Sequence, residues 1–114
     1  MKVRLKLIIL TMSSNELLVL TNNGLPEVIP TKSLLETYSF QESMHVLIKE
    51  YLEIHTGWLS IALVDAYFKD NTAYIVYGVK VPDMIKNTKG TWQPVGEMDD
   101  SVDKRLIYQA SLRS

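Results

Sequence analysis

Residues 41–58 constrain the fold of this chain more than any other stretch, because a helical pattern there meets a defined end. Apolar side chains recur at three- and four-residue steps, the spacing that gives a helix one buried face. The apolar positions are Met44, Leu47, Ile48, Tyr51, Leu52 and Ile54. Gly57 follows at a place where helices commonly end. The sequence therefore predicts a helix over about residues 41–55.

The two faces of this helix predict which side chains are buried. At about 100° per residue, a polar group falls opposite the apolar stripe. Its members are Glu42, His45, Lys49 and Glu53, with Glu50 at the flank. We expect this polar group to face solvent, and Tyr51 and Ile54 to be buried with Leu47 and Ile48.

Strand patterns lie on both sides of the helix. Residues 2–11 alternate between two faces, and their second half, Leu7–Leu10, is apolar on both, as in a strand covered on two sides. A turn at 13–15 and a second strand at 16–21 complete a hairpin. Residues 58–68 and 72–81 are β-rich around a short loop at 69–71, which predicts an antiparallel pair.

The remaining segments are less regular. Residues 25–41 contain Pro26 and Pro30 and predict no regular strand, and residues 83–99 predict a polar connection around Trp92. Asp100 can cap a final helix over about 101–112. The order β-β-α-β-β-α, with strands apolar on more than one face, predicts a layered α/β domain with helices on both sides of a sheet. We expect a single domain over residues 1–114.

Composition excludes several functions. The net charge is −1, from 12 basic and 13 acidic residues spread through the chain, which provides no basic stripe for binding nucleic acid. There is no cysteine for a disulfide, a thiolate nucleophile or a cysteine zinc site. The N-terminal apolar run, Leu7–Leu10, is too short for a signal peptide or a membrane span. We therefore expect a cytoplasmic protein without a membrane or nucleic-acid partner.

The order of elements and several motifs resemble a small Nudix domain over nearly the whole chain. Glu42-Ser43 resembles the start of the Nudix helix, and His55-Thr-Gly-Trp58 resembles its Glu-Thr-Gly end. Trp92-Gln-Pro-Val95 and the closing helix occur where that family has a Trp-x-Pro-aliphatic segment and its last helix. The resemblance implies a Nudix-like α/β/α sandwich with a mixed central sheet, formed by residues 1–114 as a single Nudix-like domain.

The metal-binding part of the Nudix motif differs in this chain. The family helix carries Arg-Glu-aliphatic-x-Glu-Glu, and an ungapped match places Glu50 at the arginine and Tyr51 at the first glutamate. Ile54 and His55 then occupy the glutamate pair. Mg²⁺ and Mn²⁺ require oxygen ligands that these side chains do not replace. This match implies a degenerate Nudix box with no metal and no cofactor.

A second match, with one inserted residue, retains part of the acidic motif. It aligns Lys49–Glu53 with Arg-Glu-x-x-Glu and keeps Glu50 and Glu53 as carboxylates. Together with Glu42 they are the candidate catalytic residues of a divergent Nudix hydrolase acting on nucleoside-diphosphate-linked compounds. Three acids on an amphipathic helix are more often a solvated face than a metal site.

Four other residues are candidates for ligand binding. Lys32 can bind a phosphate. His55 can line a pocket or carry a proton, because histidine changes its charge near neutral pH. Trp58 and Trp92 offer flat faces on which a base can stack. Each also has a structural interpretation, namely a surface lysine, a histidine that caps a helix end, and tryptophans in the core.

The resemblance, with its changed metal box, predicts a noncatalytic Nudix-like binding or regulatory module rather than an enzyme. The predicted ligand is a nucleotide-like small molecule or a protein partner. Two alternatives stay open: the divergent hydrolase, and a structural homodimer formed through exposed strand edges or aromatic side chains.

Overall fold

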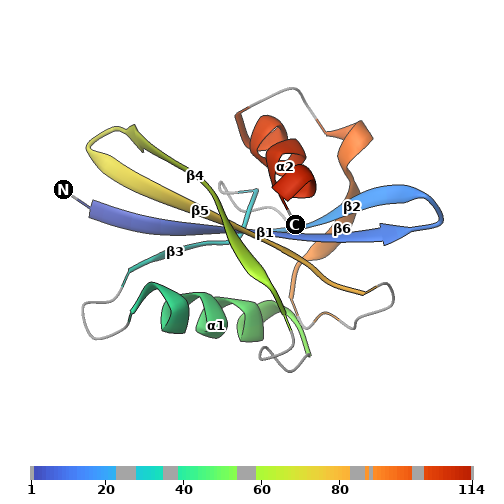
Figure 1. The fold of residues 1–114 in the computed structure, drawn as a ribbon, viewed down its shortest axis with the longest axis horizontal. Helices are drawn as coiled ribbons and strands as arrows, with labels where there is room; N and C mark the ends of the chain where they lie inside the picture. Colours follow the sequence, from blue (N-terminus) through green and yellow to red (C-terminus); the bar gives the residue numbers. More distant parts are fainter. Residues whose placement is uncertain are drawn as a thin grey trace.

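The computed structural model describes residues 2–22, 28–34, 39–53, 59–82, 87, 89–98 and 102–113. These residues form a mixed six-stranded sheet with a helix on each face (Figure 1). The elements are β1 Lys2–Ser13, β2 Glu16–Thr21, β3 Thr31–Ser33, α1 Phe40–Tyr51, β4 Ile61–Lys69, β5 Thr72–Lys80, β6 Thr91–Pro94, the short 3-10 helix η2 Val95–Glu97 and α2 Val102–Arg113. The predicted α/β/α sandwich with a mixed sheet is confirmed.

Strand β1 is the centre of the sheet. The strand order is β4-β5-β1-β2-β6, and β1 and β5 run parallel, whereas the other described pairs are antiparallel. Strand β5 pairs with one edge of β1. The other edge of β1 is shared by β2 and β3. There β3 pairs with residues 4–6 of β1, and β2 pairs with residues 10–13.

The alternation predicted for β1 divides the core into two parts. Leu5, Leu7 and Ile9 pack on the α1 side of the sheet, and Ile8 and Leu10 pack on the α2 side. All five are at most 1% exposed. A central strand covered by helices on both faces is apolar in both phases of its alternation, which is what this segment shows.

Both predicted hairpins close through two-residue turns. Ser14 and Asn15 join β1 to β2, and Asp70 and Asn71 join β4 to β5. All four have positive φ, from 50° to 65°. Such turns match the twist of the flanking strands, and asparagine and aspartate tolerate this conformation better than most residues.

Helix α1 begins where the sequence predicts and ends earlier. Ser39 caps it by accepting the backbone N–H of Glu42 at 3.1 Å. After Tyr51 the chain becomes extended at Leu52 (φ −129°, ψ 142°), which forms an isolated bridge with Asn87. The predicted continuation of the helix is therefore wrong at Leu52 and Glu53, where pairing with a distant segment replaces the helix, and residues 54 and 55 lie outside the described residues. Gly57 lies outside the described residues.

Two short strands lie in segments that were predicted to be irregular. β3 is three residues long and β6 is four. Each exists through its partner, β1 or β2, rather than through an apolar alternation of its own. Pro94 at the end of β6 is tolerated because β6 is an edge strand.

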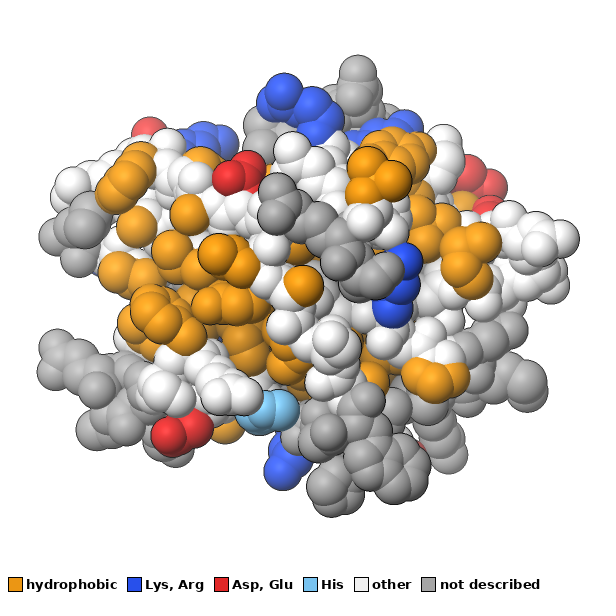
Figure 2. All heavy atoms as spheres, viewed as in Figure 1, with side chains coloured by type: hydrophobic (Ala, Val, Ile, Leu, Met, Phe, Trp, Pro, Cys, Tyr) orange, Lys and Arg blue, Asp and Glu red, His pale blue; other side chains and the backbone are white. Residues whose placement is uncertain are grey.

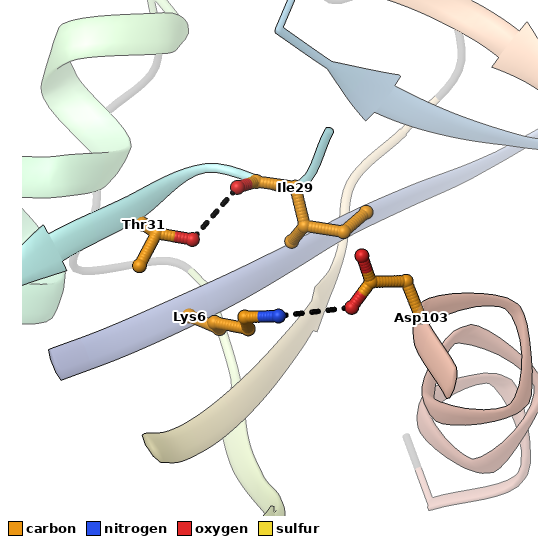
Figure 3. Close-up of polar contacts among 4 residues, drawn as sticks. All are labelled: Lys6, Ile29, Thr31 and Asp103. Atoms are coloured by element: carbon orange, nitrogen blue, oxygen red, sulfur yellow. Dashed lines mark hydrogen bonds and ion pairs between the residues drawn. The ribbon is translucent and has the colours of Figure 1, made fainter. Parts of the chain in front are cut away.

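Helix α2 is joined to the sheet by a partly buried ion pair. Figure 3 shows the amine of Lys6, from β1, pointing to Asp103 at the start of α2, at 2.9 Å. The amine also lies 5.6 Å and 5.1 Å from the ring centres of Tyr67 and Tyr74, which stack on one another. Burial lowers the pKa of Lys6, but its interactions with Tyr67 and Asp103 outweigh burial, so the pKa is raised overall.

Further along, α2 approaches the sheet closely. A Cβ atom added at Gly78 of β5 would lie 2.9 Å from Ala110 Cβ, so this glycine permits the contact. Beside β3, the Thr31 hydroxyl donates to the Ile29 carbonyl at 2.8 Å, which closes the turn that enters the strand (Figure 3). No helix in the described ranges is long and apolar enough to cross a membrane.

Candidate functional site

Tyr51, the last residue of α1, is the buried centre of a small polar cluster that extends from the core to the surface. Its side chain is 3% exposed, and its hydroxyl donates a hydrogen bond to Asn22 Oδ1, just after β2. The Lys89 ammonium lies 5.1 Å from the centre of the Tyr51 ring, a cation–π distance. We call Asn22, Tyr51 and Lys89 the Tyr51 cluster.

The segment that carries Lys89 is held on several sides. The side-chain amide of Asn87 donates to the carbonyl oxygens of Lys89 and Gly90, at 3.3 Å and 2.8 Å. Gly90 has φ +82°, and a Cβ atom there would lie 2.7 Å from the carbonyl oxygen of Thr21. The Thr21 hydroxyl in turn donates to the Thr91 carbonyl at 3.1 Å. The backbone therefore fixes the place from which Lys89 reaches the Tyr51 ring.

The acidic residues of α1 do not converge. Glu50 forms an ion pair with Lys32 of β3, whereas Glu42 and Glu53 are exposed, and Glu53 lies beyond the end of the helix. Within the described ranges, no three side chains among His, Asp and Glu are placed to hold a metal ion together. A hard divalent cation needs several oxygen ligands at one point, and these three acids do not supply them.

The burial predicted for α1 is largely confirmed. Tyr51, Leu47 and Ile48 are buried, and Glu42, Lys49 and Glu53 are exposed. Ile54 lies outside the described residues. The prediction for His45 is wrong: its side chain is half-buried and not on a fully solvated face. The polar stripe is narrower than the helical wheel indicates, because His45 borders a pocket that it shares with Ile61 of β4 and Tyr77 of β5.

The ligand-binding candidates are only partly placed. Lys32 is occupied by its pair with Glu50. Trp92 in β6 lies opposite Leu20 of β2 and packs, half-buried, against the same core as Tyr51. His55 and Trp58 lie outside the described residues. Their roles, and that of Trp92, stay predictions.

Two residues of the Tyr51 cluster were not found from the sequence. Asn22 follows a strand and Lys89 lies in a polar connection, and neither belongs to a motif or a periodic pattern. For Tyr51 the sequence predicts burial, from the apolar stripe of the helix, and the ungapped Nudix match places it at a glutamate position, but neither predicts its contacts with Asn22 and Lys89.

Comparison with known proteins connects this geometry to a fold. No protein-family model and no curated protein matches the sequence. Solved structures do match. The NUDIX domain of Shewanella oneidensis NrtR, complexed with ADP ribose, aligns with a TM-score of 0.71 at 15% identity, over 97% of this chain and 86% of that domain. The chain has the Nudix fold.

Other Nudix-fold comparisons cover the chain equally well. A C. elegans Ap4A hydrolase aligns with a TM-score of 0.70 at 12% identity, over 98% of this chain and 96% of the hydrolase. The C-terminal domain of mouse MUTYH, in complex with human PCNA, aligns with a TM-score of 0.67 at 12% identity, over 98% of this chain and 88% of that domain. At these identities the likeness concerns the Nudix fold, which hosts more than one kind of function.

Proposed function

We propose that residues 1–114 act as a single Nudix-like domain that binds a nucleotide-like small molecule without hydrolysing it. The ligand would lie beside the Tyr51 cluster, with Trp92 as the stacking surface and Lys89 as the cation that meets a phosphate. Lys32, His55 and Trp58 are the further candidates for this surface.

The observation that carries the proposal is the environment of Tyr51. In the ungapped Nudix match this residue replaces the first metal-binding glutamate, and it is 3% exposed with its hydroxyl bonded to Asn22. Lys89 places a positive charge 5.1 Å from its ring. An ammonium group repels a divalent cation and attracts a phosphate, so this site favours an anionic ligand over a metal ion.

Lys89 is better placed than Lys32 to meet such a ligand. Lys32 is already paired with Glu50, whereas Lys89 has no carboxylate partner within the described part of the chain. Trp92 lies three residues from Lys89 and is half-buried, so that part of it is open to solvent. One cation and one aromatic side chain on the same short segment suit a ligand with both a phosphate and a base.

ADP-ribose is the first probe, since the similar NrtR domain was solved in complex with it. We expect it to raise the melting temperature, since a ligand at a hundredfold excess over Kd stabilises the native state by about 2.7 kcal/mol. The shift should persist in EDTA. It should fall in Trp92→Ala and Lys89→Gln, and stay unchanged in Phe68→Ala, an exposed aromatic on β4.

Two results would contradict the proposal. One is the absence of any shift with ADP-ribose, diadenosine tetraphosphate and the common mononucleotides. The other is a shift that requires Mg²⁺ or Mn²⁺, which would favour the divergent hydrolase using Glu42, Glu50 and Glu53.

A second candidate function, a homodimer or a protein-binding surface, rests on β4. This strand is an edge of the sheet, nine residues long, with Leu63 53% exposed and Phe68 73% exposed. Unpaired edges with apolar side chains are typical sites of strand addition. The similar MUTYH domain was solved with a protein partner, PCNA. A melting temperature that rises with protein concentration, without any nucleotide effect, would support the homodimer.

A further inference from the structure

Strand β4 has a free edge, and the backbone groups that face this edge can be identified. Among the described strands β4 pairs only with β5, and a bulge interrupts their register between Leu63 and Asp65. The backbone N–H of Ala66 donates to Oδ1 of Asp65 at 2.8 Å, so this N–H is not in the ladder with β5. In an antiparallel pair, alternate residues direct their N–H and C=O to the same neighbour. Ala66 and Phe68 therefore direct these groups to the free edge.

The side chains of residues 65–69 divide between the two faces of the sheet. Asp65, Tyr67 and Lys69 lie on the α2 side, as do the β5 residues opposite them. Ala66 and Phe68 lie on the α1 side, where Phe68 is 73% exposed. Figure 2 shows an apolar area that extends from the β4–β5 hairpin toward α1. Exposed apolar areas of this kind are typical of contact surfaces.

Asp65 and Lys69 carry opposite charges along the same edge. Both side chains are exposed, and neither forms an ion pair within the described residues. They cannot pair with each other, because residues four apart in a strand are about 13 Å apart. Charged side chains on an edge usually oppose the addition of another strand. These two, however, are complementary to a second copy of the same strand in antiparallel orientation.

We infer that β4 pairs with β4 of a second copy of the chain, about a two-fold axis at Tyr67. In this register Asp65 lies opposite the partner's Lys69, and the same ion pair occurs again on the other side of the axis. Phe68 lies opposite the partner's Ala66, whose small side chain leaves room for the ring. The two outward-facing backbones exchange N–H and C=O hydrogen bonds, so the N–H of Ala66 releases Asp65.

Tyr67 meets its own copy at the axis. Within one chain its ring already stacks on Tyr74, with ring centres 5.0 Å apart. Aromatic side chains directly opposite one another across two strands stabilise the pairing. The dimer would therefore continue a row of tyrosine rings from one sheet into the next, on the α2 side.

Other registers fit this edge less well. An axis at Asp65 places the two carboxylates opposite one another, and like charges at such positions are destabilising. An axis at Ala66 leaves Asp65 opposite the partner's Tyr67. An axis at Phe68 sets two large rings opposite each other and leaves Asp65 opposite Asn71 in the turn. The axis at Tyr67 is the one that pairs both charges.

This inference rests on the homodimer given above as the second candidate function, and it adds the contact strand, the register and the residues that select them. It does not depend on nucleotide binding. β4 and β2 lie on opposite sides of β1 in the strand order, and the Tyr51 cluster includes Asn22, which follows β2.

Charge reversal tests the register. Sedimentation velocity, from micromolar to millimolar protein, measures the Kd of the dimer. Asp65→Lys and Lys69→Asp should each raise this Kd at least about tenfold, because each places like charges opposite one another on both sides of the axis. An equimolar mixture of the two variants should associate again, since the mixed dimer has opposite charges at both positions.

A matched control makes the same charge change elsewhere. Glu97→Lys alters an exposed acid just after β6, at the other edge of the sheet, and should leave the Kd unchanged. An isotope-filtered nuclear Overhauser effect between the Phe68 ring and the partner's Ala66 methyl should appear in the unaltered dimer. This measurement also decides the register if a charge-reversed variant fails to fold.

Three outcomes would overturn the inference. A chain that stays monomeric up to millimolar concentration is the first, and it leaves the nucleotide proposal, which thermal shifts test, unaffected. The second is a dimer whose Kd neither charge reversal changes, which would retain a homodimer but place its contact away from residues 65–69. The third is a mixture of the two variants that associates no more tightly than either variant alone.

Discussion

The Lys89 ammonium lies over the ring of Tyr51, 5.1 Å from its centre, at the end of α1. The two residues come from segments 38 positions apart and meet because Leu52 bridges to Asn87. The cation–π contact places a positive charge beside a buried tyrosine at the end of α1.

The first prediction concerns hydrolysis. With Mg²⁺ or Mn²⁺, we expect purified protein to release no product above buffer from ADP-ribose or diadenosine tetraphosphate, because metal charge on the bridging oxygens is what this route requires. Product release is measured by chromatography. The result that would contradict this is metal-dependent release that is abolished by Glu53→Gln. Glu97→Gln, at an exposed acid far along the chain, is the control and should leave that release intact. Such a result would establish the hydrolase instead.

The second prediction concerns the hydroxyl of Tyr51. Tyr51→Phe removes its hydrogen bond to Asn22 and should lower the free energy of unfolding by about 0.5–1.5 kcal/mol. Lys89→Met, at an exposed position, should cost less than about 1 kcal/mol. Urea titrations followed by tryptophan fluorescence measure both. A larger cost for Lys89→Met than for Tyr51→Phe would contradict this order.

The third prediction concerns the ion pair between Lys6 and Asp103. Their side chains are 13% and 26% exposed. Asp103→Ala leaves the more buried ammonium without its carboxylate and should cost about 1.5–3 kcal/mol. Lys6→Met should lower the free energy of unfolding by less, because methionine retains the apolar stem of the side chain and the carboxylate of Asp103 can be hydrated instead. The double variant should be about as stable as Lys6→Met alone, and strictly additive costs would contradict the coupling.

The fourth prediction follows from the raised pKa of Lys6. A group whose pKa is higher in the folded than in the unfolded chain adds stability below its unfolded value, near 10.5, and this contribution is lost as pH rises through the folded value. Between pH 7 and 9 Lys6 should cause no pH dependence. From pH 10 to 11 the unfolding free energy should fall more steeply in the unaltered protein than in Lys6→Met. Parallel curves in urea titrations would contradict this.

The fifth prediction concerns the contact of α2 with β5. Gly78→Ala places a methyl group 2.9 Å from Ala110 Cβ and should cost about 1–3 kcal/mol by overpacking. Ala110→Gly removes that neighbour and by itself should cost about 1 kcal/mol, since glycine is a poor helix former. The double variant should be more stable than the sum of the two costs predicts. Exact additivity, measured by thermal unfolding, would mean that the helix shifts instead.

Much of the fold follows from local patterns in the sequence. The alternation of β1, the apolar stripe of α1 and the two tight turns each depend on neighbouring residues, so their physical cause is visible in the chain itself. The burial of Tyr51 and the exposure of Glu42 and Lys49 follow from the same helical period. The Nudix-like order of elements could be recognised from these parts alone.

The tertiary structure decided the rest. β3 and β6 are too short to show a period, and they form because β1 and β2 offer unpaired edges. α1 ends at Tyr51 because Leu52 pairs with Asn87, and His45 is half-buried because β4 and β5 lie beside it. The contact of Lys89 with Tyr51 has the same origin. Such features depend on contacts between residues far apart in the chain, whose energy no local spacing encodes.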